Sequence, residues 1–317
     1  MKIELNIVAK LLWDNESFQL LCHSHPDGDT LGSASALAHA LKAMGKKVCL
    51  WCADEVAPCF GFMLEGLDFT ISDDPAFVIA VDVADPKLLG DEGNRIFGDK
   101  VDLCIDHHGS NLGYAAGTWL RADSASTAEM IYLLLKEMGC DFTPQMASCL
   151  FTGVSTDTGC FRFSNTTPQT HRIAADLIEL GADSAEIIRV FFETKSRAYA
   201  ALEKLALSEM TMYLGGRVAV MTVTRAMFGK SGAKQSDTDR LANLPRQIEG
   251  VQVGVTMKEQ EDGTFKASVR TFGDVDASAI CARLGGGGHK GAAGCTIAMP
   301  RSQAVNVLVD EIAKELK

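Results

Sequence analysis

The stretch Cys22–Ser33, which reads CHSHPDGDTLGS, decides the fold of the first half of the chain, because it joins a predicted strand to a predicted helix. Before it, Phe18–Cys22 is a short apolar run, which is typical of a buried strand. After it, leucine and alanine recur at helical spacing from Leu31 to Leu41, and Gly45 follows as a stop signal. Two histidines and two aspartates therefore lie on a strand-to-helix loop, where α/β sheets form ligand crevices. This pattern fits a metal site, and it also fits a polar turn in which an aspartate caps the helix.

Three further apolar segments extend this pattern into a parallel sheet. They span residues 46–51, 77–82 and 101–106. The last two segments end in Asp82 and Asp106, and His107 and His108 follow directly. Continuous apolar strands that alternate with helical segments indicate an α/β fold with helices on both faces of a parallel sheet. Because parallel strands end at one edge of the sheet, these polar side chains are expected to meet the first loop there.

The periodicity changes in the last third of the chain. Helical segments dominate from residue 126 to 210, and strands are predicted over 218–223, 251–256 and 265–270. We therefore predict a smaller α/β domain after the first one. The predicted boundaries are 1–190 for the first domain, 191–213 for a helical linker and 214–317 for the second domain.

Composition and charge narrow the class of protein. Residues 1–210 carry 16 Lys and Arg against 30 Asp and Glu, whereas residues 211–317 carry 14 against 11. An acidic first half can hold cations and disfavours a long nucleic-acid duplex as partner. No apolar run is long enough for a membrane span, and the N-terminus lacks the pattern of a signal peptide, so a cytoplasmic location is expected. The ten cysteines are scattered, and Cys49 and Cys52 have no second pair with which to form a zinc site.

Five motifs in order resemble the DHH phosphoesterase superfamily. They are the H-x-x-x-D-x-D pattern of His23, Asp27 and Asp29, the strand-end Asp82, the Asp106–His108 triplet, the T-D-T around Asp157, and GGGGHKGAAG at 285–294. The last motif is similar to the signature of the DHH-associated domain. The resemblance covers nearly the whole chain and is greatest to the nanoRNase and pAp-phosphatase branch.

The resemblance implies a centre with two divalent metal ions. His23, Asp27 and Asp82 are expected to hold one ion, and Asp29, Asp82, His107 and Asp157 the other, so that Asp82 bridges them. A mixed set of carboxylate and imidazole ligands suits Mn²⁺, with Mg²⁺ or Co²⁺ as alternatives. A hydroxide that bridges the two ions would attack phosphorus. His108 is then expected to face the substrate phosphate, and Asp106 to orient a ligand histidine.

The glycine-rich segment predicts the second substrate contact. Four consecutive glycines, Gly285, Gly286, Gly287 and Gly288, favour neither helix nor strand, so we expect a loop whose amide groups approach an anion. His289 follows directly, and Arg270 shares one strand face with Lys266 and Ser268. These side chains are expected to bind substrate in a cleft between the two domains. Arg162 is either a substrate contact or an ordinary surface arginine.

The resemblance implies a manganese-dependent phosphodiesterase and phosphatase. Its expected reactions are the hydrolysis of short oligoribonucleotides to mononucleotides and of pAp to AMP. The expected partners are short single-stranded RNA or nucleotides, with no long duplex and no membrane; a homodimer is left open. The alternatives are a phosphodiesterase for linear or cyclic dinucleotides, a RecJ-like single-strand exonuclease, and a nucleotide-binding regulator without catalysis.

Overall fold

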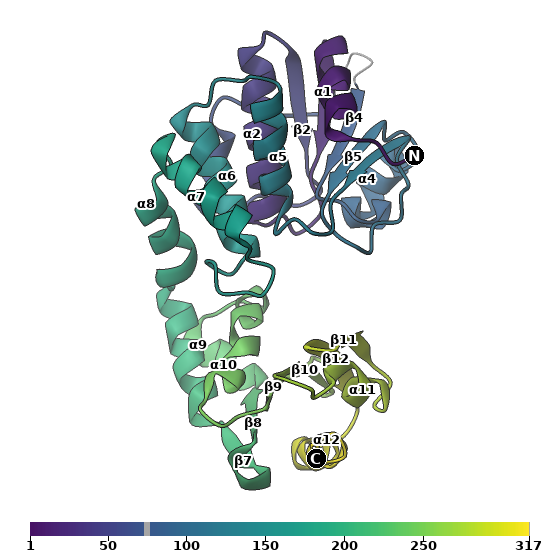
Figure 1. Cartoon of the computed structure of the whole chain (residues 1–317). Helices are drawn as coiled ribbons and strands as arrows, with labels where there is room; N and C mark the ends of the chain where they lie inside the picture. The colour runs from purple at the N-terminus through teal and green to yellow at the C-terminus, as the bar shows by residue number, and fades with distance from the viewer. Residues whose placement is uncertain (73–76, 317) are drawn as a thin grey trace. The chain divides into compact units, whose positions relative to one another are not determined.

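A computed structural model describes residues 1–72 and 77–316 and divides the chain into two compact units. Unit 1 is Met1–Thr194 and unit 2 is Lys195–Lys317 (Figure 1). Each unit contains its own sheet and its own buried apolar clusters.

Unit 1 is built on a six-stranded sheet in which every pair of neighbours is parallel. Its strands are β1 (Ser17–Leu21), β2 (Lys47–Trp51), β3 (Asp68–Phe69), β4 (Phe77–Val81), β5 (Leu103–Asp106) and β6 (Gly117–Leu120). The strand order is β3-β2-β1-β4-β5-β6, so the order of connection reverses between β1 and β4. Ligands of open α/β sheets bind at such a switch point, beside the carboxyl ends of the strands.

Helices cover both faces of this sheet, as the sequence pattern predicted. Strand residues such as Leu20 and Ile79 face one apolar cluster, whereas Leu21 and Ala80 face another, because successive side chains of a strand alternate. The first face carries α1 (Leu5–Asp14), α2 (Gly28–Ala43), α5 (Thr127–Glu137), α6 (Pro144–Asp157) and α7 (Pro168–Glu179). The second face carries the 3₁₀ turn Pro86–Leu89 and α4 (Gly90–Phe97). The predicted fold class of the first domain is therefore confirmed.

Helices α2 and α6 pack unusually closely, and this contact positions the site. A Cβ atom added to Gly32 of α2 would overlap the carbonyl oxygen of Cys149. A Cβ atom added to Gly153 of α6 would lie 2.6 Å from Cβ of Ala128 and 2.9 Å from Oδ1 of Asp29. Glycine at these two positions lets the helix backbones approach each other, and it leaves room for Asp29 beside α6.

The helical stretch that the sequence predicts up to residue 210 ends in three elements, which lie on both sides of the boundary between the units. The chain forms α8 (Ser184–Ile188), a π-helical turn (Arg189–Glu193) and, after Ser196, α9 (Arg197–Ser208). Ser196 accepts a hydrogen bond from the backbone N–H of Tyr199 and so caps α9. The remaining elements of unit 1 are the 3₁₀ turn Pro58–Phe60 and α3 (Gly61–Leu64).

Unit 2 is built on a six-stranded sheet with the order β11-β12-β10-β9-β8-β7, in which β8 and β9 are parallel and the other neighbours antiparallel. Its strands are β7 (Thr211–Tyr213), β8 (Val218–Val223), β9 (Val253–Glu259), β10 (Phe265–Thr271), β11 (Gly287–His289) and β12 (Ala292–Ile297). One apolar cluster joins β9 and β10 to α11 (Ala277–Ala282) and α12 (Arg301–Ala313). A second cluster joins β8 to α9 and α10 (Arg225–Ser231). The 3₁₀ segments of unit 2 are Leu214–Gly216, Gln235–Asn243 and Pro245–Gln247.

The glycine-rich segment is only partly the loop that its composition predicts. Gly285 and Gly286 form the turn after α11, but Gly287–His289 is strand β11, which pairs with β12 at the edge of the sheet. The expectation that the glycines avoid strand was wrong, because backbone pairing with β12 outweighs the weak strand preference of glycine.

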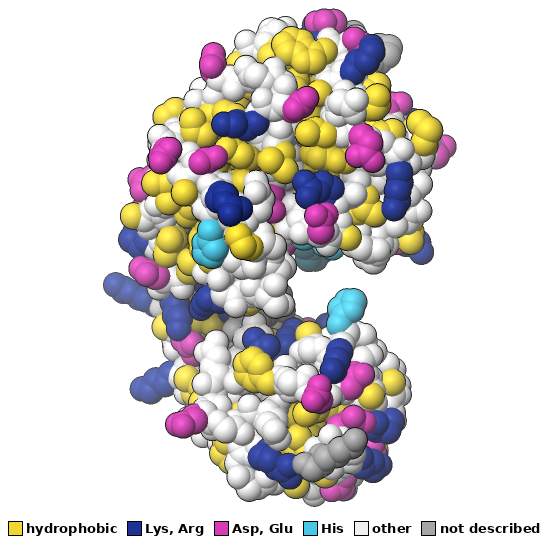
Figure 2. All heavy atoms as spheres, in the orientation of Figure 1, with side chains coloured by type: hydrophobic (Ala, Val, Ile, Leu, Met, Phe, Trp, Pro, Cys, Tyr) yellow, Lys and Arg dark blue, Asp and Glu magenta, His cyan; other side chains and the backbone are white. Residues whose placement is uncertain are grey.

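The surface of unit 1 mixes side chains of both charges. Figure 2 shows acidic and basic side chains interspersed among apolar ones over the visible face of α1, α5 and α7. Among residues 1–72 and 77–316, none of the helices combines the length and the apolar character that crossing a bilayer requires.

Candidate metal centre

Four segments of unit 1 bring polar side chains to the carboxyl edge of the sheet. His23 follows β1, Asp82 follows β4, and Asp106 ends β5 directly before His107 and His108. Asp27 is the N-cap of α2, Asp29 lies in its first turn, and Asp157 is the last residue of α6. The six predicted metal ligands, of which three lie within residues 23–29 and three come from distant parts of the sequence, are therefore neighbours in the structure.

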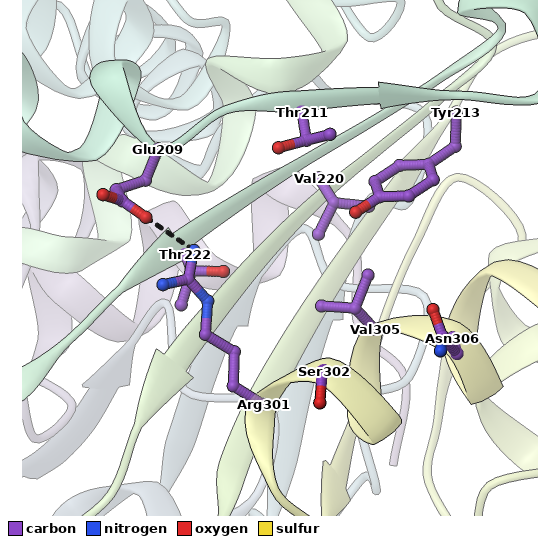
Figure 3. Close-up of a pocket in the computed structure, with 9 residues that line it drawn as sticks. All are labelled: Glu209, Thr211, Tyr213, Val220, Thr222, Arg301, Ser302, Val305 and Asn306. Atoms are coloured by element: carbon purple, nitrogen blue, oxygen red, sulfur yellow. Dashed lines mark hydrogen bonds and ion pairs between the residues drawn. The ribbon is translucent and has the colours of Figure 1, made fainter.

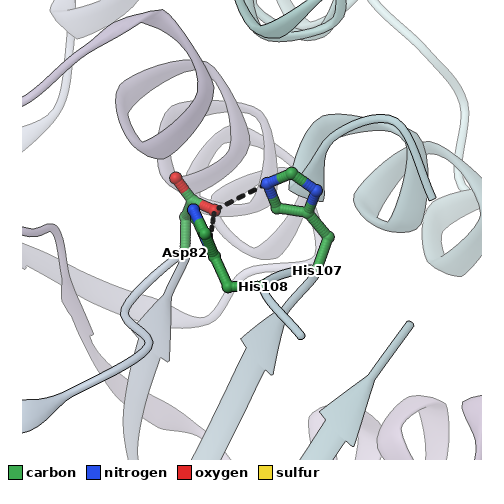
Figure 4. A group of neighbouring side chains, drawn as sticks. All are labelled: Asp82, His107 and His108. Carbon is green, nitrogen blue, oxygen red and sulfur yellow. Dashed lines mark ion pairs between the residues drawn. The ribbon is translucent and has the colours of Figure 1, made fainter. Parts of the chain in front are cut away.

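Asp82 lies at the centre of this group. Its Oδ2 is 3.7 Å from Nε2 of His23, and its Oδ1 is 3.7 Å from Nε2 of His107. Figure 4 shows the second of these contacts, together with the 3.5 Å separation between the same Oδ1 and Nδ1 of His108. The backbone of Asp82 has a φ of 64°, a left-handed conformation that aspartate and asparagine tolerate better than most residues. The two oxygens of one carboxylate thus face two different histidines.

The first group consists of His23, Asp27 and Asp82. Nε2 of His23 lies 3.6 Å from Oδ1 of Asp27. Its Nδ1 is 2.8 Å from the carbonyl oxygen of Ser24, so the proton belongs on Nδ1 and the lone pair of Nε2 is directed at the two carboxylates. Metal-binding histidines have this arrangement, in which the other ring nitrogen donates to a carbonyl or carboxylate.

The second group consists of Asp29, His107 and Asp157. Nε2 of His107 lies 3.5 Å from Oδ2 of Asp157 and 3.9 Å from Oδ2 of Asp29. Its Nδ1 is 3.2 Å from the carbonyl oxygen of Ser124, which again leaves the lone pair on Nε2. This Nε2 atom is buried and has no hydrogen-bond partner among the described residues. A buried nitrogen of this kind needs a partner, and a metal ion would supply one.

The separations within both groups fit metal ligands. The ligand atoms of each group lie within 4.8 Å of one another. Separations of 3.5–3.9 Å are too long for hydrogen bonds, but they suit atoms that each lie about 2.0–2.2 Å from a common ion. The donor set of oxygen and imidazole nitrogen belongs to divalent ions. The residues present therefore fit two divalent ions that share Asp82.

The electrostatics of the group favour cations. Burial, together with the neighbouring carboxylates, raises the pKa of Asp29 and of Asp82. The same two causes raise the pKa of Asp157 to about 6. For Asp27, burial is outweighed by the electrostatic interaction with the His23 imidazole and by hydrogen bonds from the backbone N–H groups of Asp29 and Thr30, which lower its pKa. Carboxylates so close together repel one another, and divalent cations would relieve that repulsion.

Asp106 and His108 form a hydrogen-bonded pair at the edge of this group, and His108 also belongs to a third metal-compatible set with Asp82 and His107. Nδ1 of His108 lies 2.8 Å from Oδ1 of Asp106, and Asn111 donates to Oδ2 of Asp106 at 2.6 Å. The hydrogen bond to Asp106 raises the pKa of His108 to about 9, so that this imidazole is protonated at neutral pH. Asp106 was expected to orient a ligand histidine; it contacts His108, whereas His107 is oriented by the carbonyl oxygen of Ser124.

Several neighbours of the site were not predicted as site residues from the sequence. Thr127 donates its hydroxyl to Oδ1 of Asp82 at 2.8 Å and its N–H to Oδ2 of Asp29 at 2.7 Å. Asn165 donates to the carbonyl oxygen of Asp157 at 3.2 Å. Residues 126–129 have the spacing of a helix cap, but that pattern does not indicate that the cap contacts carboxylates from other segments.

Other candidate residues lie outside the metal groups. The exposed ring of His25 pairs with Asp54, with 2.7 Å between Nδ1 and Oδ2. Cys49 and Cys52 do not occur in any of the metal-compatible groups found among the described residues. Arg162 donates from Nε to the carbonyl oxygen of Gly159 at 2.6 Å.

In unit 2, the strand register places Arg270 and His289 on one face of the sheet. Arg270 of β10 pairs with Ala292 of β12, which in turn pairs with His289 of β11. Directly paired residues of antiparallel strands point to the same face, and two strand spacings separate Arg270 from His289 by about 10 Å. The backbone beside them is tight, because a Cβ atom on Gly288 would lie 2.6 Å from Cα of Ala293.

A pocket of about 180 Å³ opens on that face. It is lined by Thr238, Ala242, Thr256, Lys258, Lys266, Ser268 and Arg270. Three of these side chains are cationic, none is anionic, and three carry hydroxyl groups. This composition suits an anion such as a phosphate.

A second pocket of unit 2, of about 260 Å³, has a different character (Figure 3). It is lined by Glu209, Thr211, Tyr213, Val220, Thr222, Arg301, Ser302, Val305 and Asn306. The guanidinium of Arg301 contacts Oε2 of Glu209 at 2.7 Å, so its one cation and one anion pair with each other. None of the residues predicted to bind substrate lines this pocket.

Comparison with protein families gives two matches. Residues 18–154 match the N-terminal domain of the DHH family, and residues 215–317 match the DHHA1 domain. The first match includes all the predicted metal ligands except Asp157, and the second includes Arg270 and the glycine-rich segment.

Two bacterial relatives cover most of the chain. The bifunctional oligoribonuclease and PAP phosphatase NrnA of Thermus thermophilus is 34% identical over 99% of this chain and 94% of its own length. The protein of the same name from Bacillus subtilis is 28% identical, with 87% of each chain covered. Among solved structures, an exopolyphosphatase-related protein from Bacteroides fragilis has a TM-score of 0.87 at 24% identity, covering 98% of this chain and 95% of that one, which supports the fold.

Proposed function

The chain belongs to the DHH family, and on that basis we propose that it is a phosphoesterase that hydrolyses short oligoribonucleotides and pAp. The observation that carries the proposal is the position of Asp82, whose two oxygens face His23 and His107 from opposite groups of candidate ligands. The similarity to two relatives that are named oligoribonuclease and PAP phosphatase supports this substrate class.

We propose that the centre holds two Mn²⁺ ions. His23, Asp27 and Asp82 are the proposed ligands of one ion, and Asp29, Asp82, His107 and Asp157 those of the other. When bound, such ions supply Lewis-acid stabilisation of phosphoryl oxygens and lower the pKa of water. The mixture of carboxylate and imidazole donors supports manganese over magnesium, which prefers oxygen ligands alone.

His108 is the proposed contact for the phosphate that is cleaved. Its Nδ1 is occupied by Asp106, so Nε2–H is the donor that remains for an anion. In the ion-free site the hydrogen bond to Asp106 raises the pKa of His108 to about 9, so this pair favours a ring that donates to the phosphate and offsets its charge. Asp106 keeps the ring in place and is itself held by Asn111.

Unit 2 is proposed to bind a further anionic part of the substrate. Arg270, His289 and the Gly285–Gly288 segment are the proposed contacts, and the cationic pocket beside Arg270 supports that role. The acidic composition of residues 1–210 and the aromatic content of 7% disfavour a processive exonuclease, which would need a basic groove and stacking aromatics for a long strand.

The substrate is tested by comparing Mn²⁺-dependent turnover of five compounds. They are a ribodinucleotide, a ribo-five-mer, a long single strand, pAp and pyrophosphate. We expect efficient hydrolysis of the dinucleotide, the five-mer and pAp, and kcat/KM values at least about tenfold lower for the long strand and pyrophosphate. Preferential hydrolysis of the long strand or of pyrophosphate would refute the proposal.

The role of Asp82 is tested with Asp82→Asn, which keeps the shape of the side chain and tolerates the same left-handed backbone. We expect a loss of kcat/KM greater than the roughly 10–100-fold that outer-shell partners of metal ligands cost. We also expect titration calorimetry to show fewer than two Mn²⁺ ions per chain. Asp91→Asn, on the exposed side of α4, is the matched control and should keep both properties. Full activity of Asp82→Asn would exclude a bridging role.

A further inference from the structure

The first turn of α5 and the loop before it contact most of the candidate metal ligands. The N–H groups of Thr127 and Ala128 donate to Oδ2 and Oδ1 of Asp29 at 2.7 and 2.8 Å. The hydroxyl of Thr127 donates to Oδ1 of Asp82 at 2.8 Å. The N-terminus of α5 therefore orients two of the carboxylates by hydrogen bonds from one short segment.

The loop residues Ser124 and Ala125 extend these contacts to two more candidate ligands. The carbonyl oxygen of Ser124 accepts from Nδ1 of His107 at 3.2 Å, which determines the tautomer of that ring. The carbonyl oxygen of Ala125 accepts from Asn165 at 3.0 Å, and the same amide group donates to the carbonyl oxygen of Asp157. Four of the six candidate ligands are thus connected to the segment Ser124–Ala128.

One buried carboxylate holds this segment together. Glu129 is 3% exposed, and its Oε2 accepts from the hydroxyl of Ser124 at 2.9 Å and from the N–H of Ala125 at 3.1 Å. In an ordinary capping box, the glutamate at this position accepts from the N–H of the cap residue, here Ser126. Glu129 reaches instead to the two residues before the cap, which are the residues that contact His107 and Asn165.

Hydrogen bonding of the second carboxylate oxygen does not explain why residue 129 is a glutamate. Its Oε1 atom is buried and has no hydrogen-bond partner among the described residues. Burial of a carboxylate with incomplete hydrogen bonding opposes folding, so a helix cap alone would not require this residue.

We infer that Glu129 is a positioning residue of the metal centre. Its hydrogen bonds go to Ser124 and Ala125 and not to a candidate ligand. It acts by holding these two residues, whose carbonyl oxygens orient His107 directly and Asp157 through Asn165. The inference rests on the proposed metal centre. Removal of outer-shell partners of metal ligands costs roughly 10–100-fold in metal affinity, and that is the expected effect here.

The test is titration calorimetry of Mn²⁺ with the full chain and three variants. Glu129→Ala removes both hydrogen bonds to the loop and should weaken Mn²⁺ binding roughly 10–100-fold. Glu129→Gln keeps an oxygen that can accept both bonds, and should restore most of that affinity. Thr167 is the N-cap of α7, and its Oγ1 accepts from the N–H of Thr170 at 3.2 Å. Thr167→Ala removes this cap and leaves the metal centre unchanged.

Thr167→Ala separates a structural role from a positioning role. It should lower the melting temperature without changing Mn²⁺ affinity, because only a helix cap is lost. If Glu129→Ala behaves in the same way, with a lower melting temperature and unchanged affinity, the inference is overturned. If Glu129→Ala does not fold, the Ser124→Ala variant is tested in its place. It removes one donor to Glu129 and keeps the carbonyl that contacts His107. Weaker Mn²⁺ binding by this variant supports the inference, and unchanged binding overturns it.

The readout also separates this inference from the proposed function. Ion binding does not depend on which phosphoester the enzyme hydrolyses. Failure of the unchanged protein to bind Mn²⁺ would overturn the metal centre and this inference together. Equal Mn²⁺ affinity in the unchanged protein and in a folded Glu129→Ala variant would overturn this inference alone.

Discussion

At the scale of single residues, the site is a cluster of carboxyl groups whose charged forms are disfavoured by burial. The pKa values of Asp29, Asp82 and Asp157 are raised because these groups are buried beside one another. His108 compensates in part, because its hydrogen bond to Asp106 keeps it charged. The ion-free site therefore prefers to bind protons, and metal ions compete with those protons for the same oxygens.

We predict that the ion-free protein becomes less stable as the pH rises from 5.5 to 8.5. Carboxyl groups whose pKa is raised on folding bind more protons in the folded state, so the stability that they contribute is lost as the pH rises through the folded pKa, about 6 for Asp157. His108 acts in the same direction, since its contribution is present below the unfolded value and is lost as the pH approaches 9. Urea unfolding in EDTA at pH 5.5, 7.0 and 8.5 measures the slope.

The control for this pH dependence is Asp157→Asn. The variant lacks one of the shifted groups and should give a flatter profile. Saturating Mn²⁺ should reverse the trend between pH 5.5 and 7.0, because deprotonated ligands bind the ion better. Stability of the ion-free protein that rises with pH would contradict the assigned shifts.

At the scale of elements, the contact between α2 and α6 determines where Asp29 lies. Gly153 of α6 faces Asp29 and Ala128, with no space for a side chain. Helix α6 also carries Asp157 at its end, so the same helix places one candidate ligand and confines another. Packing between these helices and geometry of the site are therefore coupled.

We predict that Gly153→Ala reduces both stability and metal binding. The added methyl would press on Oδ1 of Asp29 and on Ala128, and overpacking of this kind costs about 1–3 kcal/mol. The matched control is Gly61→Ala at the start of α3, where a Cβ atom meets nothing within 4 Å and the φ of −55° is helical. Urea unfolding and Mn²⁺ calorimetry measure both effects. If the two variants behave alike, the close contact has no functional consequence.

The elements that could be predicted are those whose own residues determine them. The runs at 18–22, 77–82 and 101–106 are mostly apolar and lead to His23, Asp82 and Asp106, so the strands and the polar residues at their ends are visible in the sequence. Strand β11 was not predicted, because its glycines form a strand only through pairing with β12. The contacts of Thr127 and Ser124 with the site were also not predicted, since they depend on how α5 packs against segments about 20 to 100 residues away.

At the scale of the whole molecule, the chain consists of two units with separate apolar cores. The candidate metal ligands all belong to unit 1, and Arg270 and His289 belong to unit 2. The proposed metal binding and the proposed anion binding therefore belong to different units, and each unit is stabilised by its own apolar core.

We predict two thermal transitions, of which Mn²⁺ raises only one. A ligand that binds the folded state alone stabilises it by about 2.7 kcal/mol at a concentration of 100 times Kd, and only unit 1 has the proposed ligands. Scanning calorimetry with and without Mn²⁺ measures the shift, and Asp82→Asn should abolish it. A single transition that moves as a whole would show that the two units unfold together.

The strand order of unit 1 also has a consequence for synthesis of the chain. Strand β1 lies between β2 and β4, so its second edge stays unpaired until residues 77–81 have been made. The group of His23, Asp27 and Asp82 has all its members once Asp82 has been made, whereas the group of Asp29, His107 and Asp157 lacks its last member until the end of α6. Because a chain leaves the ribosome from its N-terminus, the nascent protein cannot assemble this centre until half of it has been translated. Metal acquisition is therefore a late event in the biogenesis of the protein.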